Sequence, residues 1–232
     1  GAVTAGARLG RACPAPARPA LAAVVATAAA GGAGLLDDLD QGAHDGPSPA
    51  KGLHGHLRAL ARGRVTTGVV KVAVIGSGAL VGGVLLARGR GGGLVATAVD
   101  AAGSAVVIAS WANLLNLLDL RPGRAAKAAV VVCLPLLAGS AGASRLLASG
   151  ALGTAAATLP EDLMERTMLG DTGANALGAL VGTALAAHPS RLLRAVAAGT
   201  ATTLVLASER VSFTQVIEST PLLDALDRCG RL

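Results

Sequence analysis

The chain has 232 residues, of which 52% are hydrophobic and only 15% charged. Together with a mean hydropathy of +0.59, this composition excludes an ordinary soluble domain and predicts an all-α, polytopic transmembrane helix bundle. The formal net charge of +6 is explained by the usual excess of Lys and Arg on the cytoplasmic side of a membrane, and no nucleic-acid partner is expected. The three cysteines lie far apart and indicate neither a zinc site nor a disulfide framework.

Seven apolar segments approach the roughly 20 residues that a helix needs to cross a bilayer core. The expected spans lie near residues 20–36, 69–87, 96–115, 126–143, 146–160, 173–188 and 191–207. Residues 1–19 are expected to be a truncated N-terminal segment, 20–207 the transmembrane domain, and 208–232 a cytoplasmic tail. The glycines of 75–78 and 81–83 predict helix-packing surfaces rather than a phosphate loop, because they lie inside a span.

Carboxylates stand at the ends of three of these segments. Asp37 and Asp38 close the first span, Asp119 follows the third, and Asp171 precedes the sixth. If the first span ends on the cytoplasmic side, alternation of the spans brings all four acids to that side, which also holds most of the Lys and Arg residues. Asp100, near the other end of its span, is interpreted as an interfacial residue.

Such a cluster suits a divalent cation and a phosphate-bearing ligand. Carboxylate oxygens with water are typical Mg²⁺ ligands, and Mg²⁺ usually also binds substrate phosphates. The N-terminus of the sixth span, at 172–174, is expected to offer free N–H groups to a diphosphate. The loop after the first span adds basic side chains that can bind phosphate, namely His44, Lys51, His54, His56, Arg58 and Arg64.

Each feature taken alone has a simpler explanation. An acid pair at a helix end is commonly interfacial charge, and residues 51–58 could lie as an amphipathic stretch on anionic lipid. Asn113 and Asn116 share a helix face and could bond to a neighbouring helix. The convergence of the three segments favours a functional site.

The three segments resemble motifs of the membrane-embedded UDP-sugar:polyprenyl-phosphate sugar-1-phosphate transferases, the family of the phospho-MurNAc-pentapeptide transferase and of UDP-GlcNAc transferases that start other envelope glycans. Residues 34–38 (Gly-Leu-Leu-Asp-Asp), followed by the basic stretch 51–57, resemble the acid-pair motif and its loop. Residues 113–119 resemble the Asn-x-x-Asn-Leu-x-Asp motif, and 170–178 the Gly-Asp-x-Gly motif. The segments keep the family's order.

The resemblance implies a Mg²⁺-dependent enzyme of the cytoplasmic membrane, with its active face in the cytoplasm. A polyprenyl phosphate would attack a UDP-sugar, release UMP and receive a sugar-1-phosphate, with an N-acetylhexosamine as the expected sugar; a homodimer is left open. The implied catalytic residues are Asp37, Asp38, Asp119 and Asp171, the last two as metal ligands. The implied substrate-binding residues are Lys51, His54, His56, Asn113, Asn116, Arg121, Gly170 and Gly173.

Two positions depart from the family pattern. Pro122 stands where a further acid usually follows the Asn motif, and the lysine that commonly follows the acid pair closely is absent, the next being Lys51. The alternative is therefore a catalytically inactive membrane protein on the same scaffold, which binds lipid phosphate or a partner.

Overall fold

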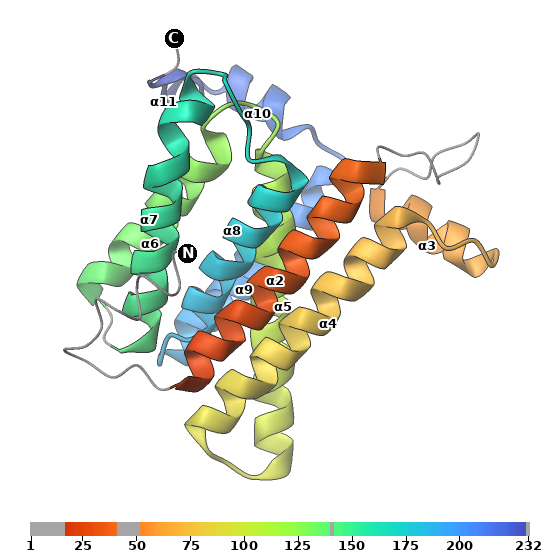
Figure 1. The fold of residues 1–232 in the computed structure, drawn as a ribbon, viewed down its shortest axis with the longest axis vertical. Helices are drawn as coiled ribbons and strands as arrows, with labels where there is room; N and C mark the ends of the chain where they lie inside the picture. Colours follow the sequence, from red (N-terminus) through yellow and green to blue (C-terminus); the bar gives the residue numbers. More distant parts are fainter. Residues whose placement is uncertain (1–16, 41–51, 140–141, 231–232) are drawn as a thin grey trace.

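The computed structural model describes residues 17–40, 52–139 and 142–230, and these residues form helices and no strand (Figure 1). The first five helices are α2 (Ala17–Asp40), α3 (Gly52–Ala61), α4 (Thr67–Arg90), α5 (Leu94–Leu118) and α6 (Arg124–Gly139). The remaining five are α7 (Ala143–Leu163), α8 (Gly170–Ala186), α9 (Arg191–Ser208), α10 (Phe213–Ser219) and α11 (Pro221–Arg228). Most of the predicted N-terminal segment, 1–16, lies outside the described residues.

Each of the seven predicted apolar segments coincides with a helix, α2 or one of α4 to α9. Among the described helices, α2, α4 and α5 are long and apolar enough to cross a membrane, which indicates a membrane protein. The shorter helices α6, α8 and α9 have 16, 17 and 18 residues, or about 24 to 27 Å of helix against a hydrocarbon core of about 30 Å. The prediction of seven spans is therefore not confirmed.

Helix α8 occupies the centre of the bundle, in contact with α2, α5 and α7. Nearly every residue from Ala174 to Ala186 is buried, polar Asn175 and Thr183 included. Helix α4 packs against both α2 and α5, and the three helices lie side by side (Figure 1).

Small residues set the distance between these helices. A β-carbon at Gly78 would overlap Ala29 of α2, one at Gly83 would overlap the carbonyl of Ala101 in α5, and one at Gly178 would overlap the carbonyl of Trp111. The prediction that the glycines of 75–83 form packing surfaces is confirmed for Gly78 and Gly83. Close backbone approach of this kind is typical of helices that associate in membranes.

Antiparallel packing gives the bundle two distinct ends. One end collects the C-termini of α2 and α5 and the N-termini of α4 and α8, with α10 and α11 lying over the start of α6 (Figure 1). The other end holds the α4–α5 connection and the start of α9. The three acid-bearing segments all belong to the first end.

Candidate functional site

A lysine joins two of the predicted acids. The Nζ atom of Lys71, in the second turn of α4, lies 2.8 Å from Oδ2 of Asp37 and also forms an ion pair with Oδ2 of Asp171. The lysine side chain is 13% exposed, whereas each carboxylate is about one-third exposed. An ammonium between two carboxylates offsets the repulsion that would otherwise separate the ends of α2 and α8.

The second acid of the pair holds the start of α8. Asp38 accepts hydrogen bonds from the backbone N–H of Asp171 at 3.1 Å, from the backbone N–H of Thr172 at 3.0 Å and from the Thr172 hydroxyl at 2.6 Å. A carboxylate at a helix N-terminus satisfies first-turn donors and interacts favourably with the helix dipole. Asp38 therefore caps α8 from another helix.

This cap corrects one expectation. The N–H groups at the start of α8 were predicted to be free for a diphosphate, but that of Thr172 is bonded to Asp38 and that of Gly173 donates to the carbonyl of Leu169. The prediction overlooked that a neighbouring helix can supply the acceptor.

Two glycines allow this close approach. A β-carbon at Gly34 of α2 would overlap the backbone of Asp171 and Thr172. Gly170 begins α8 with φ +63°, in the left-handed region that a side chain disfavours. Both positions belong to the motifs recognised in the sequence: Gly34 allows the backbone contact between α2 and α8, and Gly170 allows the left-handed backbone with which α8 begins.

Asp119 lies at the C-terminal end of α5, and the residue is only 9% exposed. Burial, and next the negative charge of Asp162 at the end of α7, raise the pKa of Asp119 to about 7, although the N–H of Gly170 donates to the carboxylate. The charges of Asp171 and Asp38 act in the same direction as Asp162. Asp119 is thus electrostatically part of the cluster formed by α2 and α8.

Two asparagines connect α5 and α8 beneath the acids. The side-chain amide of Asn175 donates to Oδ1 of Asn116 at 3.1 Å and to the backbone carbonyl of Asp171 at 2.6 Å. Asn113 lies one turn earlier on α5 and is partly buried. The interhelical bonding that was considered for these asparagines is confirmed for Asn116.

Two buried oxygen atoms of this region could bind a hard divalent cation, but they do not form a complete metal site. Oδ1 of Asp119 and Oδ1 of Asn175 are buried and have no hydrogen-bond partner among the described residues, and oxygen donors of this kind suit Mg²⁺. Within the same part of the chain, no three His, Cys, Asp or Glu side chains are grouped as a metal site. A bound Mg²⁺ would therefore need substrate oxygens as well, as is usual for this ion.

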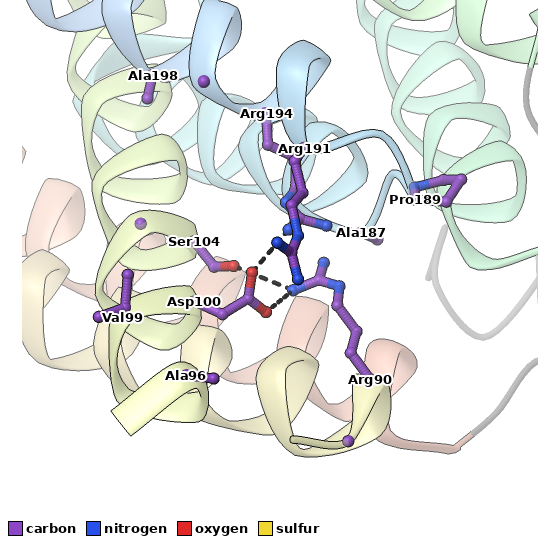
Figure 2. A pocket seen from close by; sticks show the side chains of 13 residues that line it. Arg90, Ala96, Val99, Asp100, Ser104, Ala187, Pro189, Arg191, Arg194 and Ala198 are labelled. Carbon is purple, nitrogen blue, oxygen red and sulfur yellow. Dashed lines mark hydrogen bonds and ion pairs between the residues drawn. The ribbon is translucent and has the colours of Figure 1, made fainter. Parts of the chain in front are cut away.

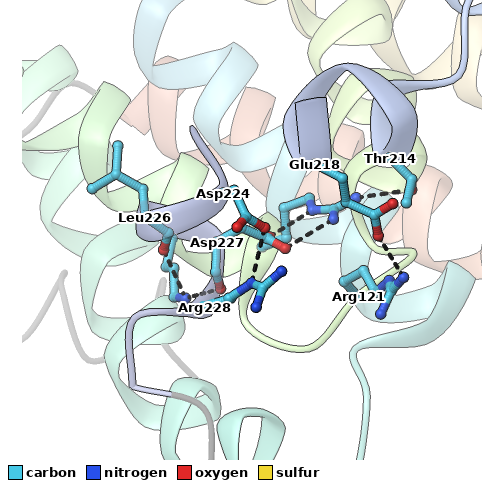
Figure 3. A network of polar contacts seen from close by, with 9 residues as sticks. Arg121, Thr214, Glu218, Asp224, Leu226, Asp227 and Arg228 are labelled. Atoms are coloured by element: carbon cyan, nitrogen blue, oxygen red, sulfur yellow. Dashed lines mark hydrogen bonds and ion pairs between the residues drawn. The ribbon is translucent and has the colours of Figure 1, made fainter. Parts of the chain in front are cut away.

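Of the basic residues after the first span, Arg58 and Arg64 are exposed, whereas His56 packs against the start of α4. Nδ1 of His56 lies 2.8 Å from the hydroxyl of Thr66, which caps α4, and the imidazole ring fills the space beside Gly68. Lys51 and the side chain of His54 lie outside the described residues. Arg121 forms an ion pair with Glu218 at 2.7 Å, so that it joins the C-terminal helices (Figure 3).

The sequence interpretation missed three residues of this cluster, Lys71, Asp162 and Asn175. Lys71 had a usable signal, because a lone lysine near the end of an apolar span is costly and commonly has a partner. Asp162 and Asn175 carry no comparable signal, since their relation to Asp119 and Asn116 arises only from the packing of α7 and α8.

No family model, curated protein or solved structure matches the chain.

Proposed function

We propose that this protein is a phosphoglycosyl transferase that moves a sugar-1-phosphate, N-acetylhexosamine-1-phosphate in the first instance, from a UDP-sugar to a polyprenyl phosphate. The observation that supports this most is the meeting of three separate segments at one end of an apolar bundle, where Lys71 bridges Asp37 and Asp171 and Gly170 donates to Asp119. The resemblance of the three segments to the motifs of the transferase family, in the same order along the chain, supports the same proposal. The proposed site faces the cytoplasm.

In the proposed reaction an oxygen of the polyprenyl phosphate attacks the β-phosphorus of the UDP-sugar. A new P–O bond forms, the bond between the β-phosphorus and the bridging oxygen breaks, and UMP leaves with that oxygen. Little covalent chemistry is required of the protein, so that positioning and charge neutralisation carry the rate enhancement.

Asp37 and Asp38 have different roles in this scheme. Both carboxylate oxygens of Asp38 accept hydrogen bonds from the first residues of α8. We therefore assign Asp38 as a positioning residue. Asp37 contacts Lys71 through Oδ2, lies beside the Asp171 carboxylate, and is the better candidate to orient or deprotonate the lipid phosphate. The Lys71 ammonium would bind a phosphate oxygen while holding Asp171 in place.

Asp119 and Asp171 are the residues that would hold Mg²⁺, with Asn116 and Asn175 beside them. The ion, when bound, would neutralise charge on the transferred diphosphate. The raised pKa of Asp119 describes the metal-free protein, because a nearby cation favours the ionised carboxylate.

The test is UMP release by the purified protein in detergent, from a panel of UDP-N-acetylhexosamines with undecaprenyl phosphate, with and without Mg²⁺. Asp171→Asn should lower the rate by about a hundredfold or more. Asp224→Asn is the matched control, because Asp224 is an acid at the same end whose partner is Arg228 on its own helix; it should leave the rate unchanged.

Absence of UMP across the panel, from a sample that melts cooperatively, would favour the inactive scaffold that binds lipid phosphate or a partner. If the transferase activity survives Asp171→Asn, the proposed function stands but the assignment of the active site to this cluster is wrong.

A further inference from the structure

A second charged site lies at the other end of the bundle, between α4, α5 and α9 (Figure 2). It is a cavity of about 810 Å³. Its polar lining comprises Arg90, Asp100, Ser104, Arg191 and Arg194, and small apolar residues complete the wall. The cavity shares no residue with the carboxylate cluster.

Asp100 organises the cavity by accepting from two helices at once. Its Oδ2 lies 2.5 Å from a guanidinium nitrogen of Arg90 and its Oδ1 lies 2.7 Å from one of Arg194 (Figure 2). Backbone carbonyls anchor the same arginines, that of Ala186 for Arg90 and that of His188 for Arg194. The two guanidinium groups are therefore fixed in position before any ligand arrives.

The residues that line the cavity have a net positive charge. Three arginines and one aspartate line it, which leaves an excess of two positive charges. Arg191 has no carboxylate partner within the described part of the chain, and it lies on the cavity wall in the first turn of α9. The dipole of α9 adds partial positive charge at this end.

The remaining wall is apolar, with Ala96, Val99 and Ala198 among its residues. An amphiphilic ligand with one anionic group would match a surface that combines fixed guanidinium groups with alanine and valine side chains. The cavity also lies near the end of α4 and the start of α5, two helices able to cross a membrane, and hence at the level where lipid headgroups are found.

We propose that this cavity binds a phosphate group, with Arg191 and Arg194 as its principal ligands and Arg90 as support. The chemistry is that of a phosphate ester or free phosphate held by guanidinium groups. A lipid headgroup and a soluble phosphate are the two sources to be distinguished. This site does not depend on the transferase proposal, because it involves none of the same residues.

The experiment is titration calorimetry of the full chain in detergent micelles with three probes: phosphatidylglycerol, phosphatidylcholine and inorganic phosphate. Arg191→Gln removes the arginine without an ion-pair partner and should weaken binding about tenfold. Arg88→Gln is the matched control, since it removes one arginine charge at the same end of the bundle, in the last turn of α4 and outside the cavity; it should leave binding unchanged.

Binding of phosphatidylglycerol alone, weakened in Arg191→Gln, identifies a lipid site, whereas binding of inorganic phosphate with the same dependence identifies a soluble ligand. A second variant, Asp100→Asn, removes the negative charge that competes with phosphate for Arg90 and Arg194, while the backbone carbonyls of Ala186 and His188 still hold both arginines in place. Phosphate binding should therefore tighten severalfold, which misfolding could not do. The proposal fails if no probe binds, or if Arg191→Gln and Arg88→Gln weaken binding equally.

Discussion

Lys71 and its two carboxylates form the most sensitive contact of the cluster. Replacing Lys71 by glutamine leaves Asp37 and Asp171 facing each other without the ammonium, which should lower the free energy of unfolding by about 1–2 kcal/mol, less than for a fully buried pair because the acids are partly exposed. The measurement is the thermal unfolding midpoint in detergent. Lys71→Arg keeps the positive charge, so its unfolding midpoint should fall less than that of Lys71→Gln. Equal midpoints for wild type and Lys71→Gln would contradict the assigned ion pairs.

Asp119 gives the protein a pH dependence of defined sign. Its pKa is raised from 3.8 to about 7 in the folded state, so the folded protein holds this proton more tightly than the unfolded chain between about pH 4 and 7. Stability from this group is therefore present at low pH and falls as the pH rises through that range. The expected result in metal-free buffer is that Asp119→Asn unfolds at a higher temperature than wild type at pH 8.

The difference between Asp119→Asn and wild type should shrink toward pH 4, where the Asp119 carboxyl group is protonated in the folded protein. A difference that does not change with pH would show that Asp119 ionises normally in the folded protein. Added Mg²⁺ should also reduce the difference at pH 8, since a cation would compensate the charge.

Gly34 of α2 lies directly against the backbone of α8, which permits a controlled test of the contact between the two helices. Gly34→Ala places a methyl group against the backbone of Asp171 and should destabilise the protein by about 1–3 kcal/mol, as overpacking does. Gly32→Ala is the matched control on the same helix, because nothing lies within 4 Å of the added carbon. Thermal unfolding midpoints of the two variants should differ clearly, and equal midpoints would contradict the close contact.

Helices α10 and α11 are fastened to the start of α6 by a buried ion pair (Figure 3). Arg124 donates to both oxygens of Asp227, at 2.8 and 3.0 Å, and both side chains are 6% exposed. Asp227→Asn leaves a buried guanidinium without its counter-charge. This change should lower the free energy that holds the C-terminal helices in place by about 3–5 kcal/mol. We expect faster hydrogen exchange in residues 213–230.

The neighbouring pair supplies the control for that experiment. Asp224 pairs with Arg228 four residues later on the same helix, and the arginine is 73% exposed, so Asp224→Asn should change exchange very little. If the two variants exchange alike, the buried pair does not hold the C-terminal helices.

For the molecule as a whole, the sequence allowed the helices and the meeting of the acids to be predicted, but only part of their bonding. Counting apolar segments was enough to bring Asp37, Asp38 and Asp171 to one end, because consecutive packed helices alternate in direction. Lys71 was missed because the expected lysine was sought close to the acid pair along the chain, whereas antiparallel packing of α2 and α4 brings it back in space.

The prediction of seven spans is not confirmed, because only three of the described helices meet the length and composition expected of a span. Apolar composition does not distinguish a helix that crosses a bilayer from one that packs within a bundle. Helix α6, with 16 residues, shows that an apolar segment can be too short to span alone. Partners outside the segment, such as the tail contacts of Arg124 and Lys127, have no signature in hydropathy.

The core of this bundle is built largely from alanine and glycine, among them Ala22, Ala26, Ala112, Gly78 and Gly178. Such residues have no rotamers to lose on folding, so these positions of the core are ordered at almost no cost in side-chain entropy. A comprehensive substitution scan should therefore show an unusual asymmetry: enlarging core side chains would be far more harmful than shortening them. The protein would tolerate lost volume and resist added volume, the opposite of a core built from leucine and phenylalanine.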